Sequence, residues 1–156
     1  MLRRPAHHHF GKRERLFLAA INAPVDPREV LAQVVTGDRA EIGQRLVRTF
    51  LAVWDGPAGS AGVTLLRSAI GNERAGKLFR EFIVTQIVRR VGPALDLDPA
   101  DARLRISLVA GQMAGLALAR YVLRIEPLAS ESPETIVAAL GPTVQRYLTG
   151  DLTTDG

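Results

Sequence analysis

Residues 99–125 form the segment that most limits how this chain can fold. Asp98-Pro99 is a favourable helix start, because Asp caps the first turn and Pro fits the first helical position. From Ile106 to Ala119 the segment runs for 14 residues without a charge, which is short for a bilayer span and typical of a buried helix. The predicted helix is apolar on most of its circumference, so it must be covered on most sides.

Two arrangements would cover such a helix. It could lie at the centre of one compact core, or it could be shared between the core and a two-fold dimer interface. Gly111 and Gly115 leave room for close backbone approach, and the other predicted helices are few and mostly short, which favours the dimer. This helix and the last one would then pair with their symmetry mates as a four-helix bundle. The candidate interface residues are Leu108, Gly111, Gly115, Leu118, Val122, Leu140, Val144 and Tyr147.

Helical spacing of apolar residues recurs along the rest of the chain. Further helices are predicted at about 12–22, 27–35, 42–54, 60–70, 73–91 and 133–148. Asp38 precedes Glu41 at the spacing of a capping box, Ser60 is a candidate N-cap, and Ser132-Pro133 repeats the start signal of residues 98–99. No alternating strand pattern of useful length competes. The predicted fold is all-α, with about six to seven helices.

The residue types exclude most catalytic chemistry. The 156 residues, which suit a single domain, include no Cys, and the three His are consecutive at 7–9. The chain therefore has no thiol nucleophile or thiolate metal site, and any imidazole chemistry would have to come from the N-terminus. We expect no enzymatic activity, no metal and no cofactor.

The net charge of +4 belongs to the N-terminus. Residues 1–15 contain five basic residues and one acid, and residues 16–156 balance at 15 basic and 15 acidic residues. Contact with a polyanion would therefore occur at that end. No targeting or membrane segment is evident, so we expect a cytoplasmic protein that does not bind membranes.

Two clusters invite a metal reading and have simpler explanations. Asp96, Asp98 and Asp101 could hold Mg²⁺, but carboxylates are favoured at a helix N-terminus for electrostatic reasons alone. His7 and His9 could face one metal in an extended segment, but consecutive His residues cannot do so on a helix. Helix capping and a solvated N-terminus are the favoured interpretations.

Two glutamines lie within apolar stripes. Gln86 falls among Phe79, Phe82 and Ile83, and Gln112 lies in the uncharged run of the long helix. A buried amide needs partners, so each is either satisfied by neighbouring backbone or directed into a cavity. A mostly apolar pocket with a few polar groups is typical of small-ligand sites.

Several stretches together resemble TetR-family transcriptional regulators of the actinobacterial type. His9–Phe17 is similar to the junction between the recognition helix and the connecting helix of that family. The other similar stretches are Arg45–Trp54, Leu66–Ala69, Gly115–Ala129 and Pro142–Gly150, so the resemblance covers nearly the whole chain.

The resemblance implies a ligand-sensing and dimerisation domain over residues 12–150. Residues 1–11 would be a remnant of the recognition-helix junction, and 151–156 a disordered tail. The last two long helices, at about 99–126 and 133–148, would form the four-helix bundle of a homodimer. The preceding helices would surround a small apolar or amphipathic ligand, and the candidate lining is Phe50, Trp54, Leu66, Phe82, Gln86, Gln112 and Met113.

In the family, a helix-turn-helix precedes this junction, and only nine residues do so here. His7, His8, Lys12 and Arg13 match positions near the DNA phosphates, which position a protein without specifying sequence. We therefore expect DNA binding only where a full-length form or a partner supplies the helix-turn-helix. The expected function is that of a TetR-like regulator, a repressor. The alternatives are a DNA-free module that binds ligands or forms heterodimers, and an all-α enzyme.

Overall fold

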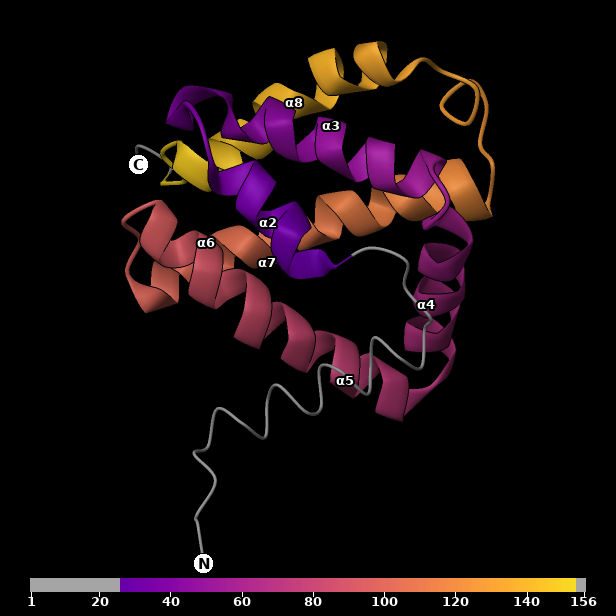
Figure 1. The fold of residues 1–156 in the computed structure, drawn as a ribbon, viewed down its shortest axis with the longest axis horizontal. Helices are drawn as coiled ribbons and strands as arrows, with labels where there is room; N and C mark the ends of the chain where they lie inside the picture. The colour runs from indigo at the N-terminus through magenta and orange to yellow at the C-terminus, as the bar shows by residue number, and fades with distance from the viewer. Residues whose placement is uncertain (1–25, 154–156) are drawn as a thin grey trace, which may run out of the picture.

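The computed structural model describes residues 26–153, which consist of helices and the turns between them (Figure 1). The helices are α2 (Pro27–Val35), α3 (Ile42–Asp55), α4 (Gly59–Gly71), α5 (Glu73–Phe82), α6 (Arg89–Ala94), α7 (Pro99–Ala117) and α8 (Pro133–Thr149). A 3-10 turn, η1 (Arg39–Glu41), precedes α3, and two π-helical segments, η2 (Ile83–Val88) and η3 (Leu118–Val122), follow α5 and α7. No strand occurs within residues 26–153, and the all-α class is confirmed.

Three of the predicted helix starts are confirmed by their hydrogen bonds. The side chains of Asp26, Asp98 and Ser132 each accept a backbone N–H of the following turn, at 2.9, 2.9 and 3.3 Å, and a proline follows each. These residues begin helices because a side-chain oxygen satisfies an N–H that has no partner within the helix. Asp98 is thus a capping residue, and no group of three His, Asp or Glu side chains within residues 26–153 could hold a metal.

The cap of α3 and the start of α4 differ from the prediction, although α3 begins at Ile42 as expected. Asp38 caps the 3-10 turn through Ala40 N–H at 2.9 Å, and the first turn of α3 is capped from α8 instead. Helix α4 begins at Gly59 and not after Ser60. The turn into it is tight, since a Cβ at Gly59 would lie 2.1 Å from the carbonyl oxygen of Trp54. Only the cap of α3 comes from a residue that is distant in the sequence.

Two predicted helix ends also differ. The helix expected at 73–91 runs without interruption from Glu73 to Ala94, with the π-helical turns of η2 inside it. The helix expected to reach Ile125 ends with η3 at Val122, and Arg124 then adopts a left-handed backbone conformation with φ of 54°. Residues 123–132 form the loop that leads to α8, referred to below as the α7–α8 loop.

The fully buried core lies among α3, α7 and α8, with contributions from α2 and α6. Its members include Leu51, Ile106, Val144 and Leu148. Helix α3 makes its most extensive contact with α8, and the two lie side by side in Figure 1. Gly43 and Gly141 allow this close crossing, because a Cβ at Gly43 would lie 2.5 Å from the backbone of α8.

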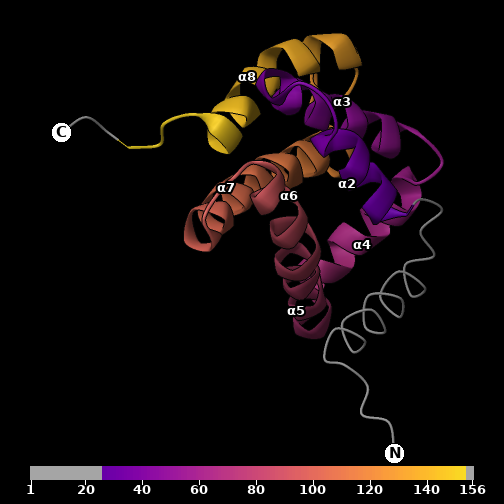
Figure 2. The same ribbon diagram turned by 60° about the vertical axis from the view of Figure 1, so that its left-hand side comes forward.

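Helices α4 and α5 form a hairpin that extends away from this core (Figure 2). Gly59 is its only fully buried residue, and neither α5 nor η2 contains one. Apolar side chains such as Leu66, Phe79 and Phe82 are half-buried. The hairpin is therefore attached to the core without a closed core of its own.

Some predictions concern residues outside the described range. The expected helix at 12–22, the junction at 1–11 and the DNA-phosphate residues His7, His8, Lys12 and Arg13 all lie there, as do residues 154–156. Within residues 26–153, no helix is both long enough and apolar enough to cross a membrane.

Candidate functional site

Three aromatic rings from two segments stack at the end of α3. Phe50 and Trp54 are one helical turn apart, and their ring centroids are 5.4 Å apart with an interplanar angle of 28°. Tyr121 of η3 stacks on the other side, 5.3 Å from Trp54 at 24°. A Cβ at Gly62 would lie 3.0–3.1 Å from the indole ring, so this glycine lets α4 pack directly against Trp54. The stack joins α3, α4 and η3, and we refer to the surface formed by Phe50, Trp54 and Tyr121 as the aromatic wall.

A polar cluster adjoins this wall and consists of Asp55, Arg120 and Tyr121. The Tyr121 hydroxyl donates to Asp55 Oδ1 at 2.7 Å, and Arg120 Nη2 lies 3.5 Å from Asp55 Oδ2. The Arg120 side chain is 8% exposed and the Asp55 side chain 36%. Arg120 Nη1 donates to the carbonyls of Leu128 and Glu131, both at 2.8 Å. The buried Arg120 Nε–H has no hydrogen-bond partner among the described residues.

The cluster keeps Tyr121 protonated. Burial of the phenol and its hydrogen bond to Asp55 raise the pKa of Tyr121 to about 12, against the opposing effect of Arg120. Burial disfavours the phenolate, and a neighbouring carboxylate disfavours it further. The hydroxyl donates to Asp55 and orients this carboxylate beside the guanidinium, and the raised pKa extends the protonated state to higher pH.

The hairpin and the π-helical segment that follows it carry three more of the predicted lining residues. Leu66 lies on α4, Phe82 ends α5, and Gln86 lies in the π-helical segment η2, all of them half-buried. Within this helix the Thr85 hydroxyl donates to the Glu81 carbonyl at 2.7 Å, a bond that competes with regular helical pairing. Single π-helical turns inside α-helices are frequent at functional sites. The hairpin thus presents one amide among partly exposed apolar groups.

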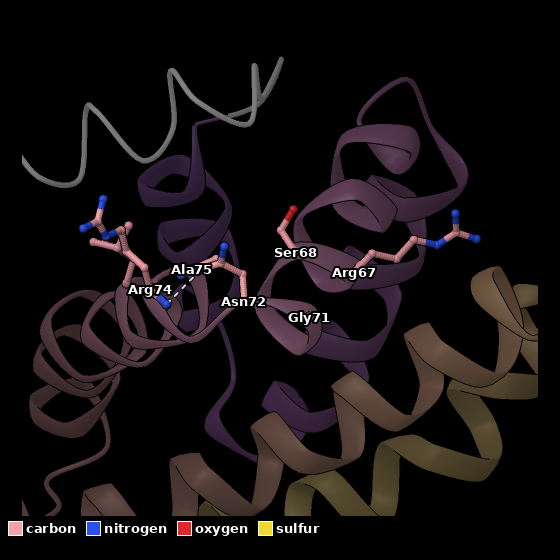
Figure 3. A pocket seen from close by; sticks show the side chains of 7 residues that line it. Arg67, Ser68, Gly71, Asn72, Arg74 and Ala75 are labelled. Carbon is pink, nitrogen blue, oxygen red and sulfur yellow. Dashed lines mark hydrogen bonds between the residues drawn. The ribbon is translucent and has the colours of Figure 1, made fainter.

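A hollow between the end of α4 and the start of α5 is chemically less promising. It has a volume of about 530 Å³ and is lined by residues that include Arg67, Asn72 and Arg74. The two arginine side chains point in opposite directions, as Figure 3 shows, so they do not converge on one anion. Asn72 accepts from the N–H groups of Arg74 and Ala75 and so serves as the N-cap of α5.

A larger groove runs between α7, α8 and the α7–α8 loop. Its volume is about 570 Å³, and its lining is mostly apolar, with Gln112, Glu131 and Thr135 as the polar side chains. Gly111 and Gly115 lie along its α7 side, and a Cβ at either glycine would meet nothing within 4 Å. Leu104 and Leu108 extend this open face along α7, with 53% and 36% of their surface exposed. We refer to these two leucines and two glycines as the α7 face.

The predicted interface residues do not all lie on the surface of the single chain. Leu108, Gly111 and Gly115 belong to the α7 face, and Leu118 and Val122 are half-buried. Leu140 lines the groove, and Leu140 and Tyr147 also pack against the core. Val144 is fully buried inside the protomer, so its placement at an interface needs correction. The crossing of α3 and α8 at Gly43 and Gly141 directs this side of α8 inward.

The predicted pocket residues also divide into groups. Phe50 and Trp54 are in the stack, Leu66, Phe82 and Gln86 are on the hairpin and its π-helical extension, and Met113 is a core residue. Gln112 lines the groove instead. Sequence reasoning missed Asp55, Arg120 and Tyr121. The available signal was a single arginine within the otherwise apolar C-terminal part of the long helix, because a charged residue there needs a partner.

Comparison with known proteins places this arrangement in a family. Residues 40–148 match the family model described as "Tetracyclin repressor-like, C-terminal domain". A solved structure of a TetR-family regulator from Streptomyces coelicolor A3 is similar at 32% identity and a TM-score of 0.55, over 91% of this chain and 73% of that one. No protein with a curated description matches the chain. The chain belongs to the TetR family of transcriptional regulators, and its matched part is the C-terminal domain of that family.

Proposed function

We propose that residues 12–150 form the ligand-sensing and homodimerisation domain of a cytoplasmic TetR-family repressor. The observation that carries the dimer is the α7 face, where two exposed leucines and two open glycines adjoin an apolar groove. Exposed apolar surface of this kind is typical of an interaction site. A second copy related by a two-fold axis would cover both α7 faces at once.

The proposed ligand is small and apolar or amphipathic. The aromatic stack offers a flat apolar wall, the hairpin offers half-buried apolar side chains, and Gln86 offers one amide for orientation. DNA contact would come from a helix-turn-helix outside the matched residues 40–148, in a longer form of the protein or in a partner. His7, His8, Lys12 and Arg13 remain predicted phosphate contacts.

Sedimentation velocity of the full chain tests the dimer. We expect a dimer for the wild type and a monomer for Gly115→Glu, because the new carboxylate would be buried unpaired in the interface. The isolated protomer should still fold, since a Cβ at this position meets no atom within 4 Å and the position is exposed. Gly71→Glu, at another open helical glycine on α4, is the matched control and should remain dimeric. A monomeric wild type, or a dimeric Gly115→Glu variant, would contradict the proposal.

Fluorescence of Trp54, the only tryptophan, tests the ligand site. The probe is anilinonaphthalene sulfonate, an amphipathic aromatic compound. We expect saturable quenching of Trp54 with one probe per protomer, and weaker binding by Phe82→Ala. Leu123→Ala, an exposed apolar residue outside the proposed site, is the control. Equal loss in both variants, or no saturation, would contradict a ligand site at this wall.

A further inference from the structure

The Arg120 guanidinium connects two regions of the molecule that have no other described polar link. On one side Nη2 faces Asp55, the last residue of α3 and the neighbour of Trp54. On the other side Nη1 holds the carbonyls of Leu128 and Glu131 in the α7–α8 loop. Leu128 and Glu131 both line the groove beside the α7 face.

The rigid guanidinium couples the position of Asp55 to the position of the two loop carbonyls. Its nitrogens lie in one rigid plane, so a displacement on the Nη2 side must turn the Nη1 bonds on the other side. The Nη2–Asp55 distance of 3.5 Å is long for a charge-assisted bond, while both carbonyl bonds are short at 2.8 Å. The Nε–H is buried and has no described partner. The loop side of the link is therefore tight, and the Asp55 side is incompletely satisfied.

The aromatic stack of Trp54 and Tyr121 also contacts Asp55 and the Arg120 guanidinium. Tyr121 stacks on Trp54, donates to Asp55 and lies under the Arg120 guanidinium, whose Cζ is 5.6 Å from the ring centroid. A molecule that displaces either ring must therefore move the Asp55 carboxylate or the guanidinium. Backbone hydrogen bonds also hold the loop, among them Ala129 N–H to Ile125 O at 2.8 Å, Ser130 N–H to Pro127 O at 3.2 Å and Glu131 N–H to Leu128 O at 3.4 Å.

We propose that Arg120 is a positioning residue that transmits changes at the Trp54–Tyr121 wall to the α7–α8 loop and so to the shape of the groove. The proposal deepens the proposed function, on which its regulatory meaning rests. The physical coupling between the wall and the loop does not require a ligand, so it can be measured on the protein as it is.

The experiment changes Asp55 and measures amide hydrogen exchange in the α7–α8 loop with residue resolution. Asp55→Asn keeps the shape of the side chain and removes its charge at a partly exposed position. We expect the amides of Ala129, Ser130 and Glu131 to exchange about threefold to tenfold faster, as for loss of one charged hydrogen bond. In an Arg120→Lys background the same Asp55→Asn change should have no further effect, because one ammonium nitrogen replaces the two nitrogens, Nη1 and Nη2, that face the carbonyls and the carboxylate separately.

Arg105 provides the matched control, since it also donates to a distant carbonyl, Tyr147 O at 3.0 Å, and pairs with Asp101. Asp101→Asn should leave the loop amides unchanged. The proposal would be overturned if Asp55→Asn left the exchange rates of the loop amides unchanged. It would also be overturned if Asp55→Asn raised these rates equally in the wild-type and Arg120→Lys backgrounds. If the Arg120→Lys protein does not fold, the Nε–H resonance of Arg120 decides. A shift caused by Asp55→Asn together with the loop amides supports the link, and an unmoved resonance overturns it.

The oligomeric state measured by sedimentation keeps the two proposals apart. If the wild type is a monomer and its loop still responds to Asp55→Asn, the proposed dimer is contradicted and the proposed Arg120 link is supported. If the wild type is a dimer and its loop does not respond to Asp55→Asn, the Arg120 link is contradicted and the dimer is supported.

Discussion

The backbone N–H of Gly43 donates to Oε1 of Gln145 at 2.7 Å, so α8 caps the first turn of α3. The residue before α3, Glu41, makes no side-chain capping bond of its own. The same amide of Gln145 donates to the carbonyl of Arg39 at 3.0 Å and to the Thr149 hydroxyl at 2.8 Å. One side chain therefore joins the turn before α3, the start of α3 and the end of α8.

Gly43→Ala should destabilise the protein. An added Cβ would lie 2.5 Å from both Gln145 N and Gly141 O, and neither backbone can move without separating α3 from α8. We expect a loss of about 2–3 kcal/mol in unfolding free energy, as for overpacking of a close contact. Urea unfolding measures it. Gly71→Ala, which has open space around it, should leave stability unchanged or raise it by less than about 1 kcal/mol.

Gln145→Met should also destabilise the protein, through a different cause. The methionine fills similar space and leaves Gly43 N–H without an acceptor, which costs about 1–3 kcal/mol for a buried donor. Thermal or urea unfolding gives the difference. Gln33→Met, an exposed position on α2, serves as the control, and equal stability of the two variants would show that the capping bond contributes nothing.

Ionisation of Tyr121 should reduce stability at high pH. The folded pKa of about 12 lies above the ordinary value of 10.0, so the proton favours the folded state. This contribution is complete below pH 10 and is lost as the pH rises from 10 towards 12. Absorbance near 295 nm should show a phenol that ionises near pH 12 in the wild type and is missing in Tyr121→Phe. A wild-type titration complete by pH 11 would contradict the combined effect of burial and the hydrogen bond to Asp55 on the pKa of Tyr121.

Gly62→Ala should change the environment of Trp54 while preserving the fold. The new methyl would lie 3.0–3.1 Å from the indole, so the ring must shift by a few tenths of an ångström within its stack. We expect a changed emission maximum or intensity together with weaker binding of anilinonaphthalene sulfonate. Gly111→Ala, far from any contact, should leave the emission unchanged. Identical spectra for all three proteins would show that α4 does not press on the indole.

The sequence predicts well what local chemistry decides. Asp26, Asp98 and Ser132 begin helices because the capping oxygen and the following proline act within one turn. The all-α class follows from helical spacing repeated along the chain. The first residue of α3 is predicted correctly, but its cap is not, because the capping side chain, Gln145, lies 102 residues from Gly43. No local pattern contains that partner.

The site was predictable only in part. Gly111 and Gly115 are predicted from their place in the uncharged run of the long helix. Val144 is predicted at the interface, but it faces inward because the crossing of α8 with α3 sets the direction of its side chain. The family resemblance includes Phe50 and Trp54 in one candidate lining, but Tyr121, the third ring of their stack, comes from η3. The π-helical turns that carry Gln86 and Tyr121 change the helical phase, and apolar periodicity does not reveal such a change.

The separation between a closed core and an open hairpin has a consequence for adaptation. Side chains on α4, α5 and η2 carry almost none of the fully buried packing, so substitutions there should have small effects on folding. Substitutions on the hairpin and η2 can then change ligand selectivity, while the core and the α7 face preserve folding and the proposed dimer. A library confined to Leu66, Phe82 and Gln86 should therefore contain mostly folded variants, and it would be a practical starting point for a sensor of altered specificity.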